Sequence, residues 1–201
     1  MTNDQDPVTV DPLGRRINAL RSALDTLHSV RPQIERAAAT IAASLASGGV
    51  LFVAGNGGSG AEAQHLAGEL VGRLEADRER PPLRSLALGA DTSTITALGN
   101  DYGFDQIFAR HLAGLAHVGD VLLALSTSGR SPNVVRAVET ARQIGVTSVG
   151  LLGPTSAALH TVCDISISAP GASTGTIQEV HLLLLHALVE HTEDLLNTSA
   201  E

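Results

Sequence analysis

The chain has 201 residues, a length that fits one domain and is sufficient to bury a hydrophobic core. Its 13 positive and 21 negative residues give a formal net charge of −8, and its few aromatic residues are one Tyr and three Phe; together these exclude bulk phosphate-backbone binding and stacking on single-stranded nucleic acid as main activities. Every positive residue is Arg, and a chain without Lys cannot form a catalytic Schiff base, attach pyridoxal phosphate or build a Walker-type phosphate loop.

The N-terminal part of the chain carries a helical pattern. Met1–Asp11 is polar and acidic, unlike a secretory signal with a basic start and an apolar centre. Across Pro12–Leu45 apolar residues recur at helical spacing, Pro32 interrupts or kinks the helix, and Gly48–Gly49 ends it. We expect residues 1–47 to form a helical segment that packs on the rest of the domain or on a neighbouring subunit.

The remainder of the chain alternates between short apolar runs and helical patterns. Strand–helix alternation indicates right-handed crossovers and a parallel sheet that is covered on both faces. We therefore expect an α/β three-layer sandwich with a five-stranded parallel sheet. Ligands of such sheets bind beyond the carboxyl ends of the strands, near the switch point, so the loops after the first and third strands are the expected binding loops. The predicted strands are 50–54, 83–88, 121–125, 147–152 and 164–168, and the predicted helices are 61–74, 92–98, 104–115, 132–144, 156–160 and 177–196.

A glycine-rich loop, Gly55–Gly60, follows the first predicted strand and leads into a helix. Its glycines let backbone amides approach an oxyanion, and the helix N-terminus adds a favourable dipole. The letters match the dinucleotide fingerprint G-x-G-x-x-G, but the acidic residue expected about 20 positions later, at the end of the second strand, is missing. Glu75 and Asp77 precede that strand, and Asp91 follows it much farther along. A purely structural turn is the alternative to anion binding at this loop.

A second loop, Ser126–Ser131, follows the third predicted strand and carries the hydroxyls of Ser126, Thr127, Ser128 and Ser131. Hydroxyls and free amides at a helix N-terminus form a phosphate cradle that needs no lysine. The alternative is ordinary capping by Ser131 before Pro132 at the first helical position. Capping explains one hydroxyl and leaves the others without a role, so the pattern favours a phosphate site.

Two predicted helices carry side chains suited to acid–base chemistry or metal binding. His65 and Glu69 lie one turn apart on the helix after the first loop, and a solvated surface pair is the alternative reading. Gln178 and His186 lie about 80° apart around the last helix, so both can line one cleft. The apolar run Leu182–Leu185 is expected to bury this helix, which also allows His186 to be a satisfied core histidine.

The segment Gly99–Phe104 follows the second strand region. Its Asn100 and Asp101 are placed to reach sugar hydroxyls, whereas a turn and helix entry would be the purely structural reading.

At this point four segments together resemble the sugar isomerase (SIS) domain and, within it, the phosphoheptose isomerases. The resemblance covers nearly the whole chain, residues 1–201 as one domain, and implies a flavodoxin-like three-layer fold. It implies a substrate loop at Asn56, Gly57, Gly58 and Ser59, a second contact at Asn100 and Asp101, and a phosphate loop at Ser126, Thr127, Ser128 and Ser131. The segments are VAGNGGSGAEAQHLAGE at 53–69, GNDYGF at 99–104, STSGRS at 126–131 and IQEVH at 177–181.

The resemblance also implies a reaction, a metal and an assembly. The reaction converts sedoheptulose 7-phosphate to D-glycero-D-manno-heptose 7-phosphate through an enediol, with Glu69 and His186 as the acid–base pair. One Zn²⁺ per subunit would be held by His65, Glu69, Gln178 and His186 in a homotetramer whose sites are shared between subunits. Moving a proton between adjacent carbons needs a base, an acid and a polarising group but no nucleotide cofactor. A carboxylate beside Zn²⁺ is less basic, so metal binding and base duty compete at Glu69.

Three positions depart from the family pattern. Thr176 stands where the family often has an arginine, Gly175 where some members carry an aspartate near the substrate, and Arg130 where asparagine is common. The first two could alter sugar recognition, and the third could favour a different phosphosugar.

Two other functions remain open on the same motifs. A replication-initiation regulator that binds the initiator DnaA has a similar fold and similar loops, and a sensor or isomerase of another ketose phosphate is the third reading. The presence of His65, Glu69, Gln178 and His186 together favours the enzyme, because an interaction surface does not need four convergent ligands.

The location of the protein follows from its cysteine and its hydropathy. Cys163 is the only cysteine and cannot form a disulfide within the chain, which is typical of a reducing compartment. The apolar stretches are far shorter than the roughly 20 residues that span a bilayer. We expect a soluble cytoplasmic protein with no membrane or direct nucleic-acid partner.

Overall fold

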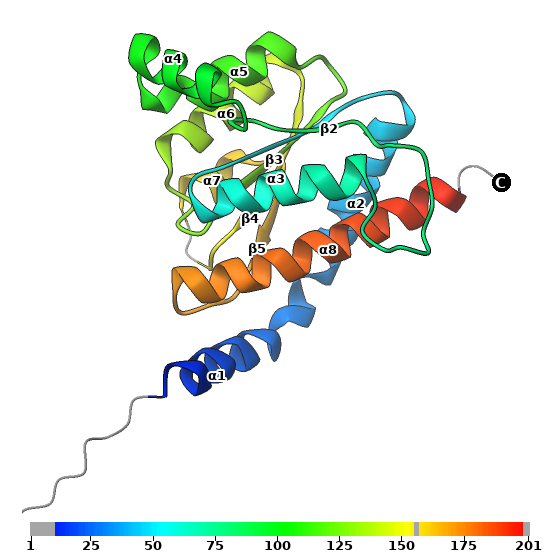
Figure 1. Ribbon diagram of the computed structural model, residues 1–201, viewed down its shortest axis with the longest axis vertical. Helices are drawn as coiled ribbons and strands as arrows, with labels where there is room; N and C mark the ends of the chain where they lie inside the picture. Colours follow the sequence, from blue (N-terminus) through cyan, green and yellow to red (C-terminus); the bar gives the residue numbers. More distant parts are fainter. Residues whose placement is uncertain (1–10, 155–156, 199–201) are drawn as a thin grey trace, which may run out of the picture.

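A computed structural model describes residues 11–154 and 157–198 of the chain (Figure 1). Residues 1–10 of the expected N-terminal segment, and Ser156 at the start of one expected helix, lie outside the described residues. The elements in chain order are α1 (Pro12–Leu24), η1 (Leu27–Val30), α2 (Arg31–Ala46), β1 (Leu51–Gly55), α3 (Gly58–Val71), β2 (Ser85–Ala87), α4 (Thr92–Tyr102), η2 (Phe104–Gln106), α5 (Ile107–Leu115), β3 (Val121–Ser126), α6 (Pro132–Ile144), β4 (Thr147–Leu152), α7 (Ala158–Val162), β5 (Ile165–Ser168) and α8 (Thr174–Thr198).

The strands form one parallel sheet in the order β2-β1-β3-β4-β5, which confirms the expected fold class. From β1 the chain moves outward to β2, and it then returns to the other side of β1 for β3 and moves outward again through β4 and β5. The switch point therefore lies between β1 and β3. Gly55 pairs with Leu125 at the carboxyl ends of these two strands, so the two loops that the sequence singled out leave the sheet side by side.

The two faces of the sheet are covered by different helices, as the three layers in Figure 1 show. On β1, which lies between β2 and β3, Leu51 and Val53 point into a core shared with α2, α3 and α8. Phe52 and Ala54 point the other way, into a core shared with α5, α6 and α7. This alternation follows from the two-residue period of a strand, and it explains why β1 and β3 read as continuous apolar runs.

The N-terminal helical pattern divides into two helices separated by a short 3-10 stretch, η1. Asp11 begins α1 by accepting a hydrogen bond from the Gly14 amide at 2.9 Å. Pro32 lies in the first turn of α2, where its missing N–H costs no helical hydrogen bond. The expected interruption at Pro32 is therefore confirmed, and it coincides with the start of a new helix.

Several helix boundaries differ from the predicted ranges, and two of these differences bear on the candidate site. Helix α3 begins at Gly58 rather than at Ala61, because Gly57 adopts a φ of +56° that turns the chain directly into the helix. Helix α4 continues through Tyr102 and ends at Gly103, whose φ is +92°. Asn100 and Asp101 therefore lie on the last turn of a helix rather than in a loop.

The expected burial of Leu182–Leu185 is half wrong. Leu184 and Leu185 are buried, but Leu182 and Leu183 are 38% and 43% exposed. Successive helical residues are rotated by about 100°, so only part of this run can face the sheet. No helix in the part of the chain that the structure describes combines the length and the apolar character needed to cross a membrane.

Candidate functional site

The serine-rich loop after β3 folds into a compact turn at the N-terminus of α6. Ser126 is buried, and its hydroxyl accepts a hydrogen bond from the Gly129 amide at 3.1 Å and lies 3.3 Å from the Ser131 hydroxyl. The hydroxyl of Ser128 accepts from the Arg130 amide at 3.3 Å. Ser131 is the N-cap residue, yet its side chain bonds to no amide of α6 among the described residues. The capping alternative therefore does not account for Ser131.

The glycine-rich loop after β1 is fixed to the serine-rich loop by a pair of amide side chains. Asn56 Nδ2 donates to Asn133 Oδ1 at 2.8 Å, and Asn133 Nδ2 donates back to Asn56 Oδ1 at 2.7 Å. Asn133 is 1% exposed and lies in the first turn of α6. The sequence analysis missed Asn133, for which the only signal was an amide residue directly after Pro132. This reciprocal pair joins the two loops across the switch point.

A hollow of about 250 Å³ opens beside the glycine-rich loop. This is slightly below the roughly 300–1,000 Å³ of typical small-molecule pockets, and its walls combine apolar side chains with polar backbone and amide groups. Its lining residues come from β1, α3, α4, α5 and the loops between them: Gly55, Asn56, Gly57, Gly60, Gln64, Leu88, Gly89, Ile95, Phe104, Ile107 and Phe108.

Asn100 and Asp101 occupy the exposed end of α4, the helix that contributes Ile95 to this hollow. Asn100 Nδ2 donates to Asp101 Oδ1 at 2.7 Å. This pair is thus placed at the edge of the site, away from the residues of α3 and α8 described next.

The N-terminal turn of α3 is in close contact with α8. A Cβ atom at Gly58 would lie 2.2 Å from Gln178 Nε2, so the side-chain amide of Gln178 rests directly on the backbone of α3. A larger residue at position 58 would displace this amide, so glycine leaves room for it. Gly58 and Gln178, which the sequence placed in different motifs, therefore form one contact.

Two histidines and a glutamate meet farther along the same two helices. His65 Nε2 of α3 lies 3.0 Å from His186 Nε2 of α8, with ring centroids 5.3 Å apart. Glu69 Oε1 lies 3.7 Å from His65 Nε2, and the side chains of His65 and Glu69 are 41% and 21% exposed. The group is therefore partly open to solvent and accessible to a small molecule.

These side chains are suited in kind to a metal ion. Imidazole nitrogens and a carboxylate oxygen are the donors that Zn²⁺ takes in proteins, and two imidazole nitrogens already face each other here. Among residues 11–154 and 157–198, no group of three or more His, Cys, Asp or Glu is arranged as a metal site. The residue types therefore suit zinc and the two imidazoles lie close together, whereas a complete set of three ligands is not arranged in the described part of the chain.

A buried pair beneath the site was not assigned a role by the sequence analysis. His181 is fully buried, and neither of its ring nitrogens has a hydrogen-bond partner among the described residues. Glu62 Oε2, which is also unpartnered in that set, lies 3.8 Å from His181 Nδ1. The pair spans α3 and α8, and His181 was visible in the sequence only as the last letter of the IQEVH segment.

The structure shows what surrounds Gly175 and Thr176, two of the positions that depart from the family pattern. A Cβ at Gly175 would lie 2.5 Å from Nη1 of Arg16, which reaches over from α1 and forms an ion pair with Glu179. Thr176 is buried, and its hydroxyl lies 3.0 Å from that of Ser173 in the first turn of α8. The guanidinium from α1 thus takes the space that a side chain at position 175 would fill, while Arg130 remains exposed at the serine-rich loop.

The chain is similar to proteins of one kind along nearly its whole length. Residues 17–153 match the SIS domain family. The chain is 44% identical to a phosphoheptose isomerase of Bradyrhizobium sp. over 96% of each chain, and 49% identical to that of Rhodospirillum rubrum over 82% of this chain and 87% of the relative. Its fold matches the solved structure of a phosphoheptose isomerase from Francisella tularensis with a TM-score of 0.81 and 38% identity, over 90% of this chain and 94% of that one.

Proposed function

Because this chain belongs to the phosphoheptose isomerase family of SIS-domain proteins, we propose that its reaction takes place between α3, α6 and α8, at the carboxyl ends of β1 and β3. The enzyme is an aldose–ketose isomerase that converts sedoheptulose 7-phosphate to D-glycero-D-manno-heptose 7-phosphate. The observation that carries the assignment of the site is the convergence of His65, Glu69 and His186 on the facing helices α3 and α8.

The phosphate group of the substrate binds at the serine-rich loop. The hydroxyls of Ser126, Thr127, Ser128 and Ser131, together with amides at the N-terminus of α6, supply hydrogen-bond donors without an opposing lysine. The close Ser126–Ser131 hydroxyl contact supports this role, because both groups lie on one compact turn.

The sugar extends from this loop toward α3 and α8. Asn56 is oriented before substrate arrives by its hydrogen bonds with Asn133, and Gln178 lies against Gly58. Both amides suit hydrogen bonding to sugar hydroxyls. The full set of proposed sugar contacts is Asn56, Gly57, Gly58, Ser59, Glu69, Asn100, Asp101 and Gln178.

Glu69 and His186 transfer the proton. From the ketose side, a base removes a proton from C1, the C1–H electron pair forms the C1=C2 bond of an enediol, and the C2 carbonyl oxygen takes up a proton. Delivery of a proton to C2 and loss of the proton from the C1 hydroxyl complete the aldose. Glu69 and His186 stand on facing helices, so they can serve the two adjacent carbons from one side of the site.

We propose that one Zn²⁺ per subunit binds at His65, Glu69, Gln178 and His186. Bound zinc would supply Lewis-acid polarisation of the sugar carbonyl. The approach of the two imidazoles and the nearby carboxylate supports this proposal. Because a carboxylate that binds a cation is less basic, Glu69 cannot serve fully as metal ligand and base at the same time.

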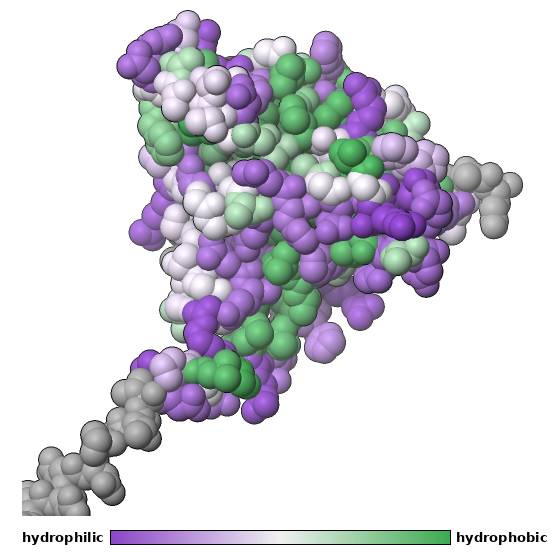
Figure 2. All heavy atoms as spheres, in the orientation of Figure 1, coloured by the Kyte–Doolittle hydropathy of each residue, from purple (hydrophilic) through white to green (hydrophobic). Residues whose placement is uncertain are grey.

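The surface of α1 and α8 supports assembly into a homotetramer. Leu13 and Ile17 of α1 are 69% and 47% exposed, and Leu182 and Leu183 of α8 are also exposed. Figure 2 shows hydrophobic side chains gathered along these helices, and a hollow of about 350 Å³ lies between α8 and the α1–α2 region. A second copy covering this surface would lie beside His186. Light scattering on the purified protein tests this assembly, and a monomer at micromolar concentration would contradict it.

One experiment tests the reaction itself. The purified protein is incubated with sedoheptulose 7-phosphate, with and without Zn²⁺, and NMR follows the aldose product and solvent exchange at C2. Turnover is the expected result, and silence from a folded protein in both conditions would direct the search to another phosphosugar or to a binding role. The single cysteine, which can form no disulfide within the chain, supports a cytoplasmic place of action.

A further inference from the structure

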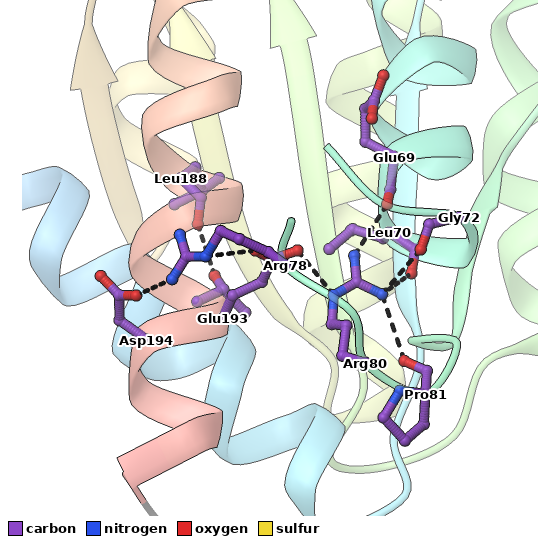
Figure 3. A network of polar contacts seen from close by, with 10 residues as sticks. Glu69, Leu70, Gly72, Arg78, Arg80, Pro81, Leu188, Glu193 and Asp194 are labelled. Carbon is purple, nitrogen blue, oxygen red and sulfur yellow. Dashed lines mark hydrogen bonds and ion pairs between the residues drawn. The ribbon is translucent and has the colours of Figure 1, made fainter. Parts of the chain in front are cut away.

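The side chain of Arg80, which lies outside α3, caps the C-terminal end of this helix. The chain leaves α3 at Val71, and Arg80 then returns to the helix end, as Figure 3 shows. Its Nη2 donates to the Glu69 carbonyl at 2.9 Å, and its Nη1 donates to the carbonyls of Leu70 at 2.9 Å and Gly72 at 3.1 Å. One guanidinium thus binds the backbone of Glu69 and of the residues that follow it.

This cap replaces the usual end of a helix. The last carbonyls of a helix lack internal partners, and many helices satisfy them with a glycine of positive φ. Gly72 does not adopt that conformation, since its φ is −87° and its ψ is −117°. The planar fork of Arg80 supplies the donors instead, and its positive charge suits the negative end of the helix dipole.

The same guanidinium is anchored to α8. Arg80 Nε donates to Glu193 Oε1 at 2.7 Å, and the two side chains are only 8% and 2% exposed. Glu193 lies about two turns after His186 and on nearly the same face of α8. Arg78 approaches Glu193 from the outer side and pairs with Asp194. A single buried ion pair therefore connects the backbone of Glu69 to the helix that carries His186.

We propose that Arg80 and Glu193 are positioning residues that set the distance between Glu69 and His186. This proposal rests on the proposed function, in which these two residues exchange the substrate proton. A buried ion pair is not needed for stability, because apolar residues of similar volume often replace one without loss. Apolar replacements cannot donate hydrogen bonds to the carbonyls of Glu69 and Leu70 in α3 and of Gly72 directly after it, however. Holding these carbonyls at a fixed position relative to α8 is the geometric role of this pair.

The double variant R80M/E193L removes both charges and keeps the volume of the buried side chains. We expect it to fold with a lowered melting temperature, because the carbonyls of Glu69, Leu70 and Gly72 lose their donors. Assayed well below that temperature, it should lose about 100-fold in kcat with little change in KM, since a misplacement of about 1 Å at reacting groups costs that much. The matched control is R78M/D194N, which changes the exposed half of the same cluster and should leave kcat and KM unchanged. A double variant with wild-type kcat at a temperature well below its melting point would overturn the proposal.

Two further measurements separate this proposal from the proposed function. If the double variant fails to fold, R80K is the second test. Lysine keeps the charge but cannot reach the three carbonyls and Glu193 at once, so R80K should show the same loss of kcat. A wild-type kcat in R80K overturns the proposal. Crystal structures of the wild type and of the folded variant need no turnover. A shift of Glu69 relative to His186 supports the positioning role even if sedoheptulose 7-phosphate is not the substrate, and unchanged positions overturn it.

Discussion

His65 and His186 point their Nε2 atoms at each other across 3.0 Å, with their rings tilted by 54°. At this distance one nitrogen can donate a single proton to the other, or both lone pairs can turn toward a shared cation. Two protons cannot lie between them. The space between α3 and α8 at this contact therefore admits either one bridging proton or a shared metal ion, and not both.

Glu69→Gln should remove turnover while leaving the fold intact. The amide has the shape of the carboxylate but cannot accept the substrate proton, and general-base catalysis is worth about 10²–10⁴-fold. Steady-state kinetics with sedoheptulose 7-phosphate measures the loss, with Glu139→Gln, an exposed partner of Arg136 on α6, as the control. Wild-type turnover in Glu69→Gln would exclude Glu69 as the base.

Ser128→Ala should mainly raise KM. A phosphate contact is present in both the bound substrate and the transition state, so its loss weakens both equally. A hydrogen bond to a charged group predicts a rise of about tenfold or more. Ser47→Ala, at the exposed end of α2, serves as the control. An unchanged KM would argue against the phosphate cradle.

His65→Ala should abolish zinc binding without removing the proposed acid–base pair. For the wild type we expect about one zinc per subunit, a melting temperature that rises with added zinc, and a loss of both effects on chelation. Elemental analysis and thermal melts measure these quantities, and His117→Ala is the control on the opposite side of the sheet. Full zinc content in His65→Ala would disprove the ligand assignment.

The ionisation of Asp164 should make the stability of the folded protein depend on pH in the acid range. Burial favours a raised pKa, but hydrogen bonds from the Ser148 hydroxyl and amide at 2.6 and 2.8 Å, with the charge of Arg142, outweigh it and lower the pKa of Asp164. Because the pKa of Asp164 is lower in the folded state than the unfolded value of about 3.9, its ionised carboxylate stabilises the folded protein. This stabilisation is fully present above about pH 3.9 and is lost as the pH falls through the folded-state pKa.

Melting temperatures of Asp164→Asn and wild type across pH test this linkage. The wild type should be more stable near neutral pH, and its advantage should shrink below about pH 4. Asp77→Asn, which changes an exposed loop carboxylate, should show no such trend. A difference in melting temperature between the wild type and Asp164→Asn that stays constant below about pH 4 would contradict the lowered pKa of Asp164.

Cys163 should be inert in the folded protein. Burial, reinforced by the neighbouring Asp164 charge, raises the pKa of its thiol to about 12, so almost no reactive thiolate forms near neutral pH. Iodoacetamide should label the thiol rapidly in denaturant and very slowly without it, as mass spectrometry can follow. Rapid labelling of the native enzyme would show that the side chain is accessible.

The sequence predicted the parts of the fold that depend on local patterns. The bounds of β4 and α6 agree with the predicted ranges. A continuous apolar run marks β4, while Pro132 at the first position of α6 and Gly145 directly after it mark the two ends of that helix. The adjacency of the loops after β1 and β3 was also predicted, since strand order in such folds places the switch point between the first and third strands.

The parts that the sequence did not predict depend on contacts between distant residues. Asn133 orients Asn56 from 77 positions away, and Arg80 reaches Glu193 across 113 positions. Neither member of these pairs carries a local signal for its partner. The early start of α3 depended on Gly57, whose positive φ the sequence permits but does not require. Tertiary contacts of this kind become visible only when the helices are placed on the sheet.

Gln178, His186 and Glu193 all lie on α8, which is one continuous helix of 25 residues. Inserting or deleting a single residue between them would rotate the later part by about 100° and displace it by about 1.5 Å. His186 would then leave His65, or Glu193 would leave Arg80. The number of residues from Gln178 to Glu193 therefore constrains the site as strongly as the identity of these three side chains, because a change of length would separate them from their partners on α3 and the loop after it.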